Sequence, residues 1–163
     1  MNKASRKKTA KRAARASTKE TVRSAAKKPK GATRIIVFAC SWYPSIAADN
    51  AGVVGLEYSA DVRILTLACA GRLTPSLVLD AFGAGAAGVL VAACKPELCH
   101  HVNGSSICER TVAETRELAE LLGIGAERVL LETFDSEKGE PFVESVESFR
   151  KRVGKLKPFV VEQ

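Results

Sequence analysis

The sequence predicts an α/β protein with a doubly wound, flavodoxin-like parallel sheet of about four strands, preceded by a basic tail that we expect to be disordered. Short and almost continuous apolar runs recur along the chain, which is typical of strands buried on both faces of a parallel sheet. Segments with helical spacing of apolar residues alternate with these runs, so the expected order is β-α-β-α-β-α-β-α. The excess positive charge is confined to the N-terminal residues, which have few apolar side chains for a core.

The strands and helices follow from this alternation. The apolar runs predict strands over residues 34–39, 62–68, 88–93 and 129–134. Helical segments are expected over residues 46–57, from Pro75, from Ser106 to Gly123, and over 142–156. The second helix has the clearest start, because Thr74 can cap it and Pro75 suits the first helical position. The third is expected to begin with a capping box formed by Ser106 and Glu109 and to stop at Gly123.

The charge distribution separates the N-terminal tail from the folded part. Residues 1–31 hold twelve Lys or Arg residues and one acid, so their net charge is +11, whereas the remaining 132 residues carry −4. Two interpretations of the tail stay open: adhesion to nucleic acid, an anionic membrane or an acidic partner, and a solubilising tail without a specific ligand. The predicted organisation is a basic tail over residues 1–31, a folded domain over 32–157 and a short C-terminal tail over 158–163.

Two absences in the sequence narrow the class of protein. No apolar run reaches the roughly 18 residues that predict a membrane-spanning helix, and no apolar stretch follows the basic N-terminus as in a secretory signal. We therefore expect a cytoplasmic protein without a transmembrane segment. The five cysteines then favour metal binding or thiol chemistry over a disulfide framework.

Three cysteines follow three successive predicted strands. Cys40 comes after the first strand, Cys69 after the second and Cys94 after the third, while Cys99 lies five residues beyond Cys94 in the same loop. The carboxyl ends of parallel strands meet at one edge of the sheet, so we expect these four thiols to converge there. Four thiolates suit an iron–sulfur cluster or a tetrahedral zinc ion. The alternative is that each cysteine is a small buried apolar residue.

Several neighbours of these cysteines are candidates for supporting roles. His100 and His101 adjoin Cys99 and are suited to metal binding, proton transfer or a hydrogen bond to a loop carbonyl. Arg72 lies in the loop after Cys69, where it would either favour the reduced state of a cluster or form a surface salt bridge. Cys108, near the start of the third helix, is either a packed thiol or a spare ligand or attacking thiolate.

Two other features are assigned no ligand. The run from Gly83 to Gly88 matches the dinucleotide pattern G-x-G-x-x-G, but it closes a helix and enters a strand, which is the reverse of the order that a nucleotide site needs. Asp49 and Asn50 are expected to be polar groups on the surface of the first helix. The sequence therefore contains no recognisable nucleotide or substrate site.

The cysteine motifs and their surroundings resemble the delta subunit of methyl-viologen-reducing hydrogenase, over about residues 34–155. The combination of the cysteine motifs with Gly71-Arg72 is specific. The matching stretches are Cys40-Ser-Trp42, Ala48-Asp-Asn-Ala-Gly52, Val62-Arg-Ile64, Cys69-Ala-Gly-Arg-Leu-Thr-Pro75, Leu79-Asp-Ala-Phe82, Gly88-Val-Leu-Val91, Cys94-Lys-Pro-Glu-Leu-Cys99-His100 and Leu121-Leu-Gly-Ile124.

The resemblance implies a [2Fe–2S] cluster on Cys40, Cys69, Cys94 and Cys99. It also implies a function in electron transfer, from a hydrogenase or formate dehydrogenase to the flavoprotein of heterodisulfide reductase, to which related domains are also fused. We therefore expect a component of an oxidoreductase complex more than a stand-alone enzyme.

The chain departs from the family pattern at three places. Tyr43 stands where the family commonly has a second cysteine, His101 stands where relatives tend to have an aromatic residue, and the basic tail is not a family feature. If the thiolate replaced by Tyr43 is a ligand in relatives, this chain has lost it, although four cysteines remain. A zinc-bound or metal-free structural adaptor of the same kind of complex is the alternative function.

Overall fold

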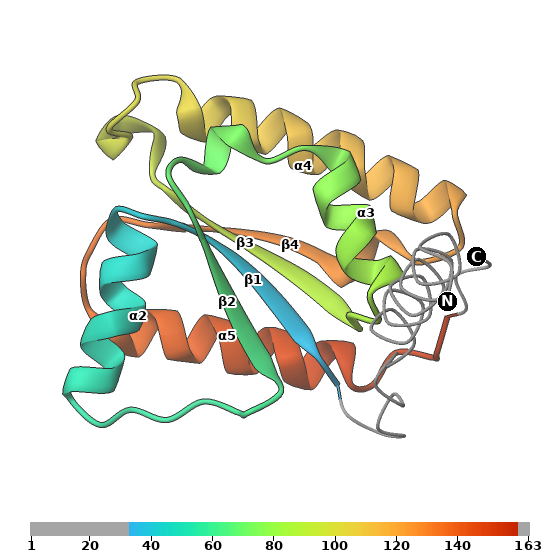
Figure 1. Ribbon diagram of the computed structural model, residues 1–163, viewed down its shortest axis with the longest axis horizontal. Helices are drawn as coiled ribbons and strands as arrows, with labels where there is room; N and C mark the ends of the chain where they lie inside the picture. The colour runs from blue at the N-terminus through green and yellow to red at the C-terminus, as the bar shows by residue number, and fades with distance from the viewer. Residues whose placement is uncertain (1–32, 160–163) are drawn as a thin grey trace, which may run out of the picture. The chain divides into compact units, whose positions relative to one another are not determined.

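The computed structural model describes residues 33–159 and shows one parallel sheet of four strands with helices on both faces (Figure 1). The strand order is β2-β1-β3-β4, which confirms the predicted doubly wound α/β fold. The predicted basic tail lies outside the described residues. The strands are β1 (Ile35–Cys40), β2 (Val62–Leu67), β3 (Gly88–Cys94) and β4 (Val129–Phe134).

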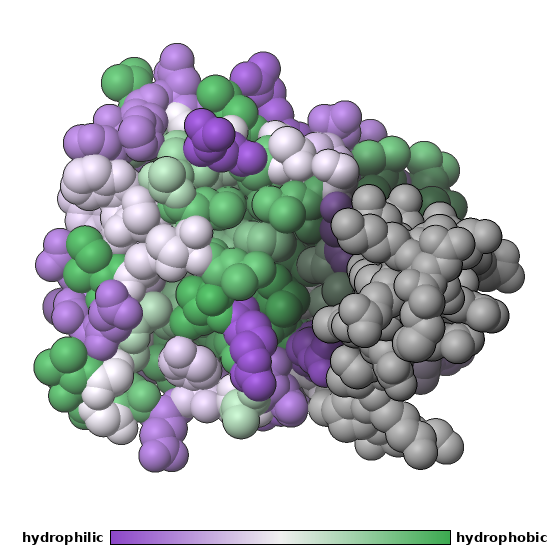
Figure 2. All heavy atoms as spheres, viewed as in Figure 1, coloured by the Kyte–Doolittle hydropathy of each residue, from purple (hydrophilic) through white to green (hydrophobic). Residues whose placement is uncertain are grey.

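The sheet is built from its two central strands outward. β1 pairs with β2 on one side and with β3 on the other, so Val37 lies opposite both Ile64 and Leu90. All seven residues of β3 are buried, as expected for a strand covered on both faces. β2 is an edge strand, and Leu65 remains 48% exposed there. Figure 2 shows apolar side chains gathered over this part of the surface.

The helices cover the sheet in two pairs. Helices α2 and α5 pack against one face, and α3 and α4 pack against the other (Figure 1). Their bounds are α2 (Tyr43–Val53), α3 (Pro75–Gly83), α4 (Gly104–Leu121) and α5 (Gly139–Val153); the short 3₁₀ helices are η1 (Ala70–Arg72), η2 (Pro96–Leu98) and η3 (Ala126–Arg128). Among the residues described, no helix is long and apolar enough to cross a membrane.

Apolar side chains at helical spacing hold these layers together. In α5, Phe142, Val146, Phe149 and Val153 are buried against one face of the sheet. Each such burial stabilises the fold by about 1.5–3 kcal/mol. On the other face of the sheet, Phe82 of α3 packs in a separate buried cluster with apolar residues of α4.

The predicted start of α3 is correct, whereas α4 begins two residues, and α2 and α5 begin three residues, before their predicted starts. Thr74 caps α3, because its hydroxyl accepts a hydrogen bond from the Leu77 amide at 3.3 Å. Helix α4 begins at Gly104 instead of Ser106, and no side-chain cap forms there. The hydroxyl of Ser105 instead donates to the Cys94 carbonyl at 2.6 Å, so a tertiary hydrogen bond anchors this helix start.

The glycine run between α3 and β3 serves as a turn. Helix α3 ends at Gly83, Gly85 has a φ of +94°, and β3 begins at Gly88. Such a φ strongly favours glycine. This order agrees with the interpretation of the run as a helix stop and not as a nucleotide-binding loop.

A buried arginine closes the sheet near the amino ends of its strands. Arg128 is 4% exposed and donates hydrogen bonds to the carbonyls of Ile124 at 3.0 Å, Ala87 at 2.8 Å and Lys157. Its guanidinium lies 4.7 Å from the centre of the Phe159 ring. Burial lowers the pKa of Arg128 from its ordinary value. The segment leading to Phe159 is therefore tied to the core, while residues 160–163 of the predicted C-terminal tail lie outside the described residues.

Candidate metal centre

Two of the predicted ligands meet at the switch point of the sheet. Cys40 and Cys94 are the last residues of β1 and β3, which are adjacent strands. Both side chains are buried, and the Cys94 thiol donates to the Cys40 sulfur at 3.6 Å. Ligands of open α/β sheets bind at this point, because the strand order reverses there.

The other two predicted ligands approach each other from separate loops. Cys69 lies two residues beyond β2, where its sulfur accepts the Gly71 amide at 3.4 Å. Cys99 follows η2 in the loop that leads to α4 and is partly exposed. Both sulfurs border the Cα of Gly104, since an added Cβ there would overlap the Cys69 sulfur and lie 3.1 Å from that of Cys99. The structure therefore brings all three strand-end cysteines and Cys99 to one edge of the sheet.

The pKa values in the first pair move in opposite directions. The hydrogen bond from Cys94 lowers the pKa of Cys40 and outweighs burial, with help from the amides of Trp42 and Ala70. The same hydrogen bond raises the pKa of Cys94, and burial raises it further, while the Tyr43 amide opposes the change. The Cys40 sulfur thus accepts the hydrogen bond that the Cys94 thiol donates, and the two sulfurs lie close enough to bind one metal.

The pKa values of Cys69 and Cys99 also move in opposite directions, but for different reasons. Burial raises the pKa of Cys69 against the Gly71 amide, and the charges of Cys40 and Cys99 raise it further. Burial would also raise the pKa of Cys99, but the Ser105 hydroxyl and nearby backbone amides lower it overall. Amide donors therefore surround the sulfurs, and such donors stabilise thiolates and tune the potential of iron–sulfur clusters.

The fifth cysteine lies inside the core. Cys108 is fully buried in α4, and burial raises its pKa to about 12. A thiol in this state is a poor ligand and a poor nucleophile. The geometry agrees with the interpretation of Cys108 as a packed thiol.

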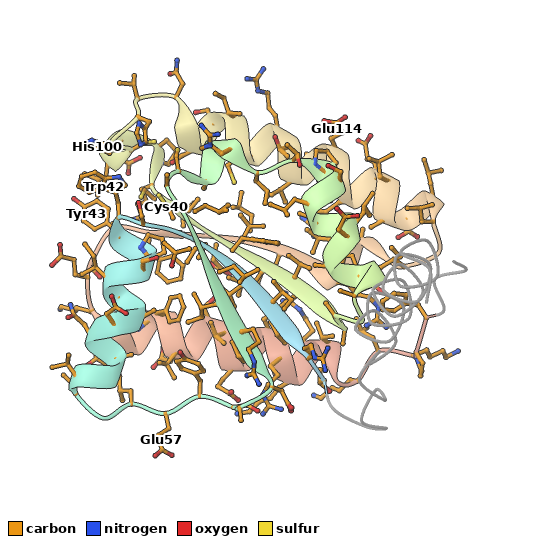
Figure 3. All side chains as sticks on the ribbon, in the orientation of Figure 1. Cys40, Trp42, Tyr43, Glu57, His100 and Glu114 are labelled. Atoms are coloured by element: carbon orange, nitrogen blue, oxygen red, sulfur yellow. The ribbon has the colours of Figure 1, made fainter. Side chains whose placement is uncertain are left out.

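Aromatic side chains cover the surface beside the thiols. Trp42 stacks on His100, with ring centroids 3.8 Å apart and planes at 24°, and His101 packs edge-on against His100 at 5.1 Å. Figure 3 shows Trp42, Tyr43 and His100 together near Cys40. The charge of His101 lowers the pKa of Cys40 slightly, being the smallest of the named causes.

The remaining candidates lie on the surface. Arg72 is exposed and forms no ion pair with any residue in the described range 33–159. Asp49 is exposed on α2, and the side-chain amide of Asn50 donates to the Glu137 carbonyl at 2.9 Å. Asp49 and Asn50 are thus polar groups of the helix surface, as predicted.

The donor set fits a group larger than a single ion. Within the described part of the chain, no three His, Cys, Asp or Glu side chains form a site for one metal ion as they stand. The sulfurs instead lie in two groups: those of Cys40 and Cys94 are 3.6 Å apart, and those of Cys69 and Cys99 both border the Cα of Gly104. A [2Fe–2S] cluster with four cysteine ligands takes two thiolates on each iron. The residues present fit such a group.

Sequence reasoning did not find the amide donors or the stacking partner of His100. The amides of Trp42, Tyr43 and Ala70 act through the backbone, so their residue types carry no signal. Trp42 offered one signal, because a tryptophan two residues after a candidate ligand is placed to cover the site.

Comparison with known proteins assigns the family. The model of the family described as "Methyl-viologen-reducing hydrogenase, delta subunit" matches residues 35–157, nearly the whole described domain. The chain belongs to this family. The match confirms the resemblance found in the sequence.

Two relatives of the delta-subunit family align along most of their length. The vhc iron-sulfur subunit of the F420-non-reducing hydrogenase of Methanococcus voltae is 32% identical over 130 residues, covering 80% of this chain and 90% of that protein. The iron-sulfur subunit of the F420-non-reducing hydrogenase of Archaeoglobus profundus is 34% identical over 129 residues, covering 79% and 94%. Both relatives are thus named as iron–sulfur proteins.

A third relative contains the delta-subunit domain within a longer chain. This relative is a subunit of the ferredoxin:CoB-CoM heterodisulfide reductase of Methanosarcina mazei, and it is 27% identical over 124 residues. The alignment covers 76% of this chain but only 16% of that protein. A delta-subunit domain is thus part of a longer polypeptide in some relatives and separate in others.

Proposed function

We propose that this chain is an electron-transfer subunit that carries a [2Fe–2S] cluster on Cys40, Cys69, Cys94 and Cys99. The observation that supports it best is the arrangement of the four thiols: the Cys94 thiol donates to the Cys40 sulfur at 3.6 Å, and the sulfurs of Cys69 and Cys99 both border Gly104. The cluster supplies a one-electron carrier, and the protein supplies the ligands, the amide donors and the cover. The names of the relatives, iron–sulfur subunits of hydrogenases, support the same cofactor.

The proposed electron path leaves through the loop around Cys99. Cys40, Cys69 and Cys94 are buried and Cys99 is partly exposed, so Cys99 is the ligand nearest to solvent. Apolar side chains are exposed beside it, namely Leu98 at 39% and Val102 at 77%. Aromatic and apolar groups are enriched in the buried cores of protein interfaces. A partner protein that docks here would approach the cluster from its least covered side.

Val102 adds a second indication that this loop is functional. Its φ is +59°, a left-handed conformation in which a β-branched residue is strained. Such strain costs about 1–3 kcal/mol and persists where the surrounding structure holds the residue in place. In this strained conformation, the apolar side chain of Val102 is exposed on the loop.

The proposed partners are a hydrogenase and a heterodisulfide-reductase-like flavoprotein. Relatives are named for the hydrogenase, and one contains the domain within a polypeptide of heterodisulfide reductase. The formate dehydrogenase implied by the resemblance stays a prediction, as does contact of the basic tail with an acidic partner or nucleic acid.

Anaerobic purification with iron and sulfide analysis tests the cofactor. We expect about two iron and two acid-labile sulfide atoms per chain and the visible absorption and reduced-state paramagnetic signal of a [2Fe–2S] cluster. Protein that stays colourless and iron-free after reconstitution with ferrous iron and sulfide would contradict the proposal.

A zinc-bound or metal-free adaptor is the alternative function, which Tyr43 in place of a family cysteine favours. Tyr43 begins α2, and its ring packs between the two cores. A tetrahedral zinc requires all four sulfurs about 3.8 Å from one another, given Zn–S bonds of about 2.3 Å. One equivalent of zinc with no visible absorption would support this alternative over the cluster.

A further inference from the structure

Two loops cross at a pair of glycines beside the thiols. A Cβ placed on Gly71, in η1, would lie 2.8 Å from the carbonyl oxygen and 2.9 Å from the Cα of Gly104. Real Cβ atoms do not approach backbone atoms so closely, and backbone atoms cannot turn aside as a side chain does. We call this contact the Gly71–Gly104 crossing.

The same crossing borders the sulfurs of the second thiol pair. A Cβ on Gly104 would overlap the Cys69 sulfur and lie 3.1 Å from the Cys99 sulfur. Neither glycine belongs to the described glycines with positive φ, which are Gly55, Gly85, Gly123 and Gly125. Alanine is therefore acceptable to the backbone at positions 71 and 104. Glycine is needed at these positions because the two loops approach each other closely, and not because the backbone adopts a conformation that only glycine allows.

The crossing has no counterpart at the first thiol pair. Cys40 and Cys94 end adjacent strands, so the hydrogen bonds of the sheet determine how far apart they lie. Cys69 follows the edge strand β2, which β1 separates from the strand that leads to Cys99. The sheet therefore cannot determine the separation of Cys69 and Cys99.

We propose that Gly71 and Gly104 are positioning residues that set the separation of the Cys69 and Cys99 sulfurs, and thereby allow these two thiolates to share one iron. This inference rests on the proposed function. A methyl group at position 104 would push the Cys69 sulfur away from the Cys99 sulfur. A methyl group at position 71 would separate the two loops that carry them.

The Gly104→Ala variant of the full chain tests the proposal, with ferrous iron and sulfide as the probe. We expect about ten- to hundred-fold weaker iron binding on reconstitution, the range found when residues that orient metal ligands are changed. Gly71→Ala should show the same loss. Iron binding and a cluster spectrum equal to those of the unaltered protein in both variants would overturn the proposal.

Two other glycines provide matched controls. Gly52 lies in α2 with nothing within 4 Å of an added Cβ, so Gly52→Ala should bind iron normally. Gly139 packs against the backbone of α2, where its Cβ would lie 2.5 Å from the Cα of Ala51. Gly139→Ala should lower the melting temperature while its folded fraction keeps a normal cluster spectrum. Loss of the cluster in Gly139→Ala equal to that in Gly104→Ala would mean that general destabilisation, and not sulfur position, explains the effect.

Cross-linking of the metal-free protein separates this inference from the proposed function. Diamide removes two electrons and two protons from a thiol pair and leaves a disulfide, which mass spectrometry can locate. We expect Gly104→Ala to reduce the yield of the Cys69–Cys99 disulfide several-fold and to leave the Cys40–Cys94 disulfide unchanged. If no variant and no unaltered protein binds iron but the cross-linking differs as expected, the cluster proposal fails and the positioning inference stands. Unchanged cross-linking overturns the positioning inference alone.

A double variant covers the case in which Gly104→Ala unfolds the protein. Replacing Cys69 by alanine removes the sulfur that the new methyl group would overlap. Cys69→Ala/Gly104→Ala should therefore melt close to the temperature of Cys69→Ala alone, which is the coupling expected of residues in contact. A double variant as unstable as the sum of its single changes would contradict the predicted overlap.

Discussion

The two ends of the sheet deal with buried polar groups in different ways. At the amino ends of the strands, Arg128 is a buried cation, and each of its three guanidinium nitrogens donates to a carbonyl within the protein. At the carboxyl ends, backbone amides converge on the sulfur atoms of Cys40, Cys69 and Cys99. A region whose polar groups are fully paired serves as scaffold. A region whose donors surround exchangeable thiol protons is prepared for a ligand that replaces those protons.

The backbone differs between the ends as well. The amino end closes with ordinary glycine turns, such as Gly85. The carboxyl end contains a strained exposed valine, Val102, and two glycines whose missing side chains let two loops touch. Val102 is the one non-glycine residue with a positive φ among residues 33–159, and strain of this kind indicates that the carboxyl end is shaped by a function.

Removal of one thiol at the carboxyl ends of the strands should have the largest effect, which is the loss of bound iron. In Cys94→Ala we expect loss of all cluster iron, because three thiolates cannot complete the two pairs. The control is Cys108→Ala, which removes a buried thiol outside the pairs and should keep its iron. Iron and sulfide analysis of both variants provides the measurement. Full iron content in Cys94→Ala would exclude Cys94 as a ligand.

A change at the amino end should affect stability and leave the metal unaffected. Arg128→Met would leave three carbonyls without their donor and should lower the free energy of unfolding by about 3 kcal/mol. Urea unfolding of the metal-free protein measures this change. Arg110→Met, at an exposed position of α4, is the control and should have little effect. Iron loss in folded Arg128→Met would show that the two ends are not independent.

The exposed aromatic stack should matter for partners and not for the fold. Trp42→Ala removes the ring that covers His100, and we expect electron transfer to a partner protein to slow about tenfold. The iron content and melting temperature should stay nearly unchanged. Leu121→Ala is the matched control, because Leu121 is 83% exposed and lies at the end of α4, away from the carboxyl ends of the strands. Equal rates in the two variants would argue against docking at Trp42.

The smallest predicted effect concerns an ion pair on α5 that anchors the loop before β2. Glu147 accepts hydrogen bonds from Arg150 at 2.9 Å and from the Ser59 amide at 2.8 Å, and the Arg150 bond lowers its pKa from 4.5. A lowered carboxyl pKa stabilises the fold above the unfolded-state pKa, and this contribution is lost as the pH falls below it. We expect Glu147→Gln to cost about 0.5 kcal/mol at pH 7 and less at pH 3, measured by urea unfolding. A cost that grew at pH 3 would contradict this assignment.

The sequence alone determined the layers and the edge where the thiols lie. Apolar runs placed all four strands within one residue. The reason is clearest for β3, where burial on both faces leaves little room for polar side chains. The cysteines could be assigned to one edge, since parallel strands must end on the same side. Thr74 and Pro75 marked the start of α3 through local chemistry, which needs no distant partner.

Only the tertiary structure decided how the thiols pair. Cys40 lies beside Cys94 because β1 and β3 are neighbours, and strand order depends on packing between segments far apart in the chain. Cys69 meets Cys99 through the Gly71–Gly104 crossing, which is a contact between two loops and leaves no periodic pattern in the sequence. The start of α4 was misplaced for the same reason, because the Ser105 hydroxyl is committed to the carbonyl of Cys94, eleven residues away. Local chemistry can be read from neighbouring residues, whereas contacts between separate elements exist only once the chain has folded.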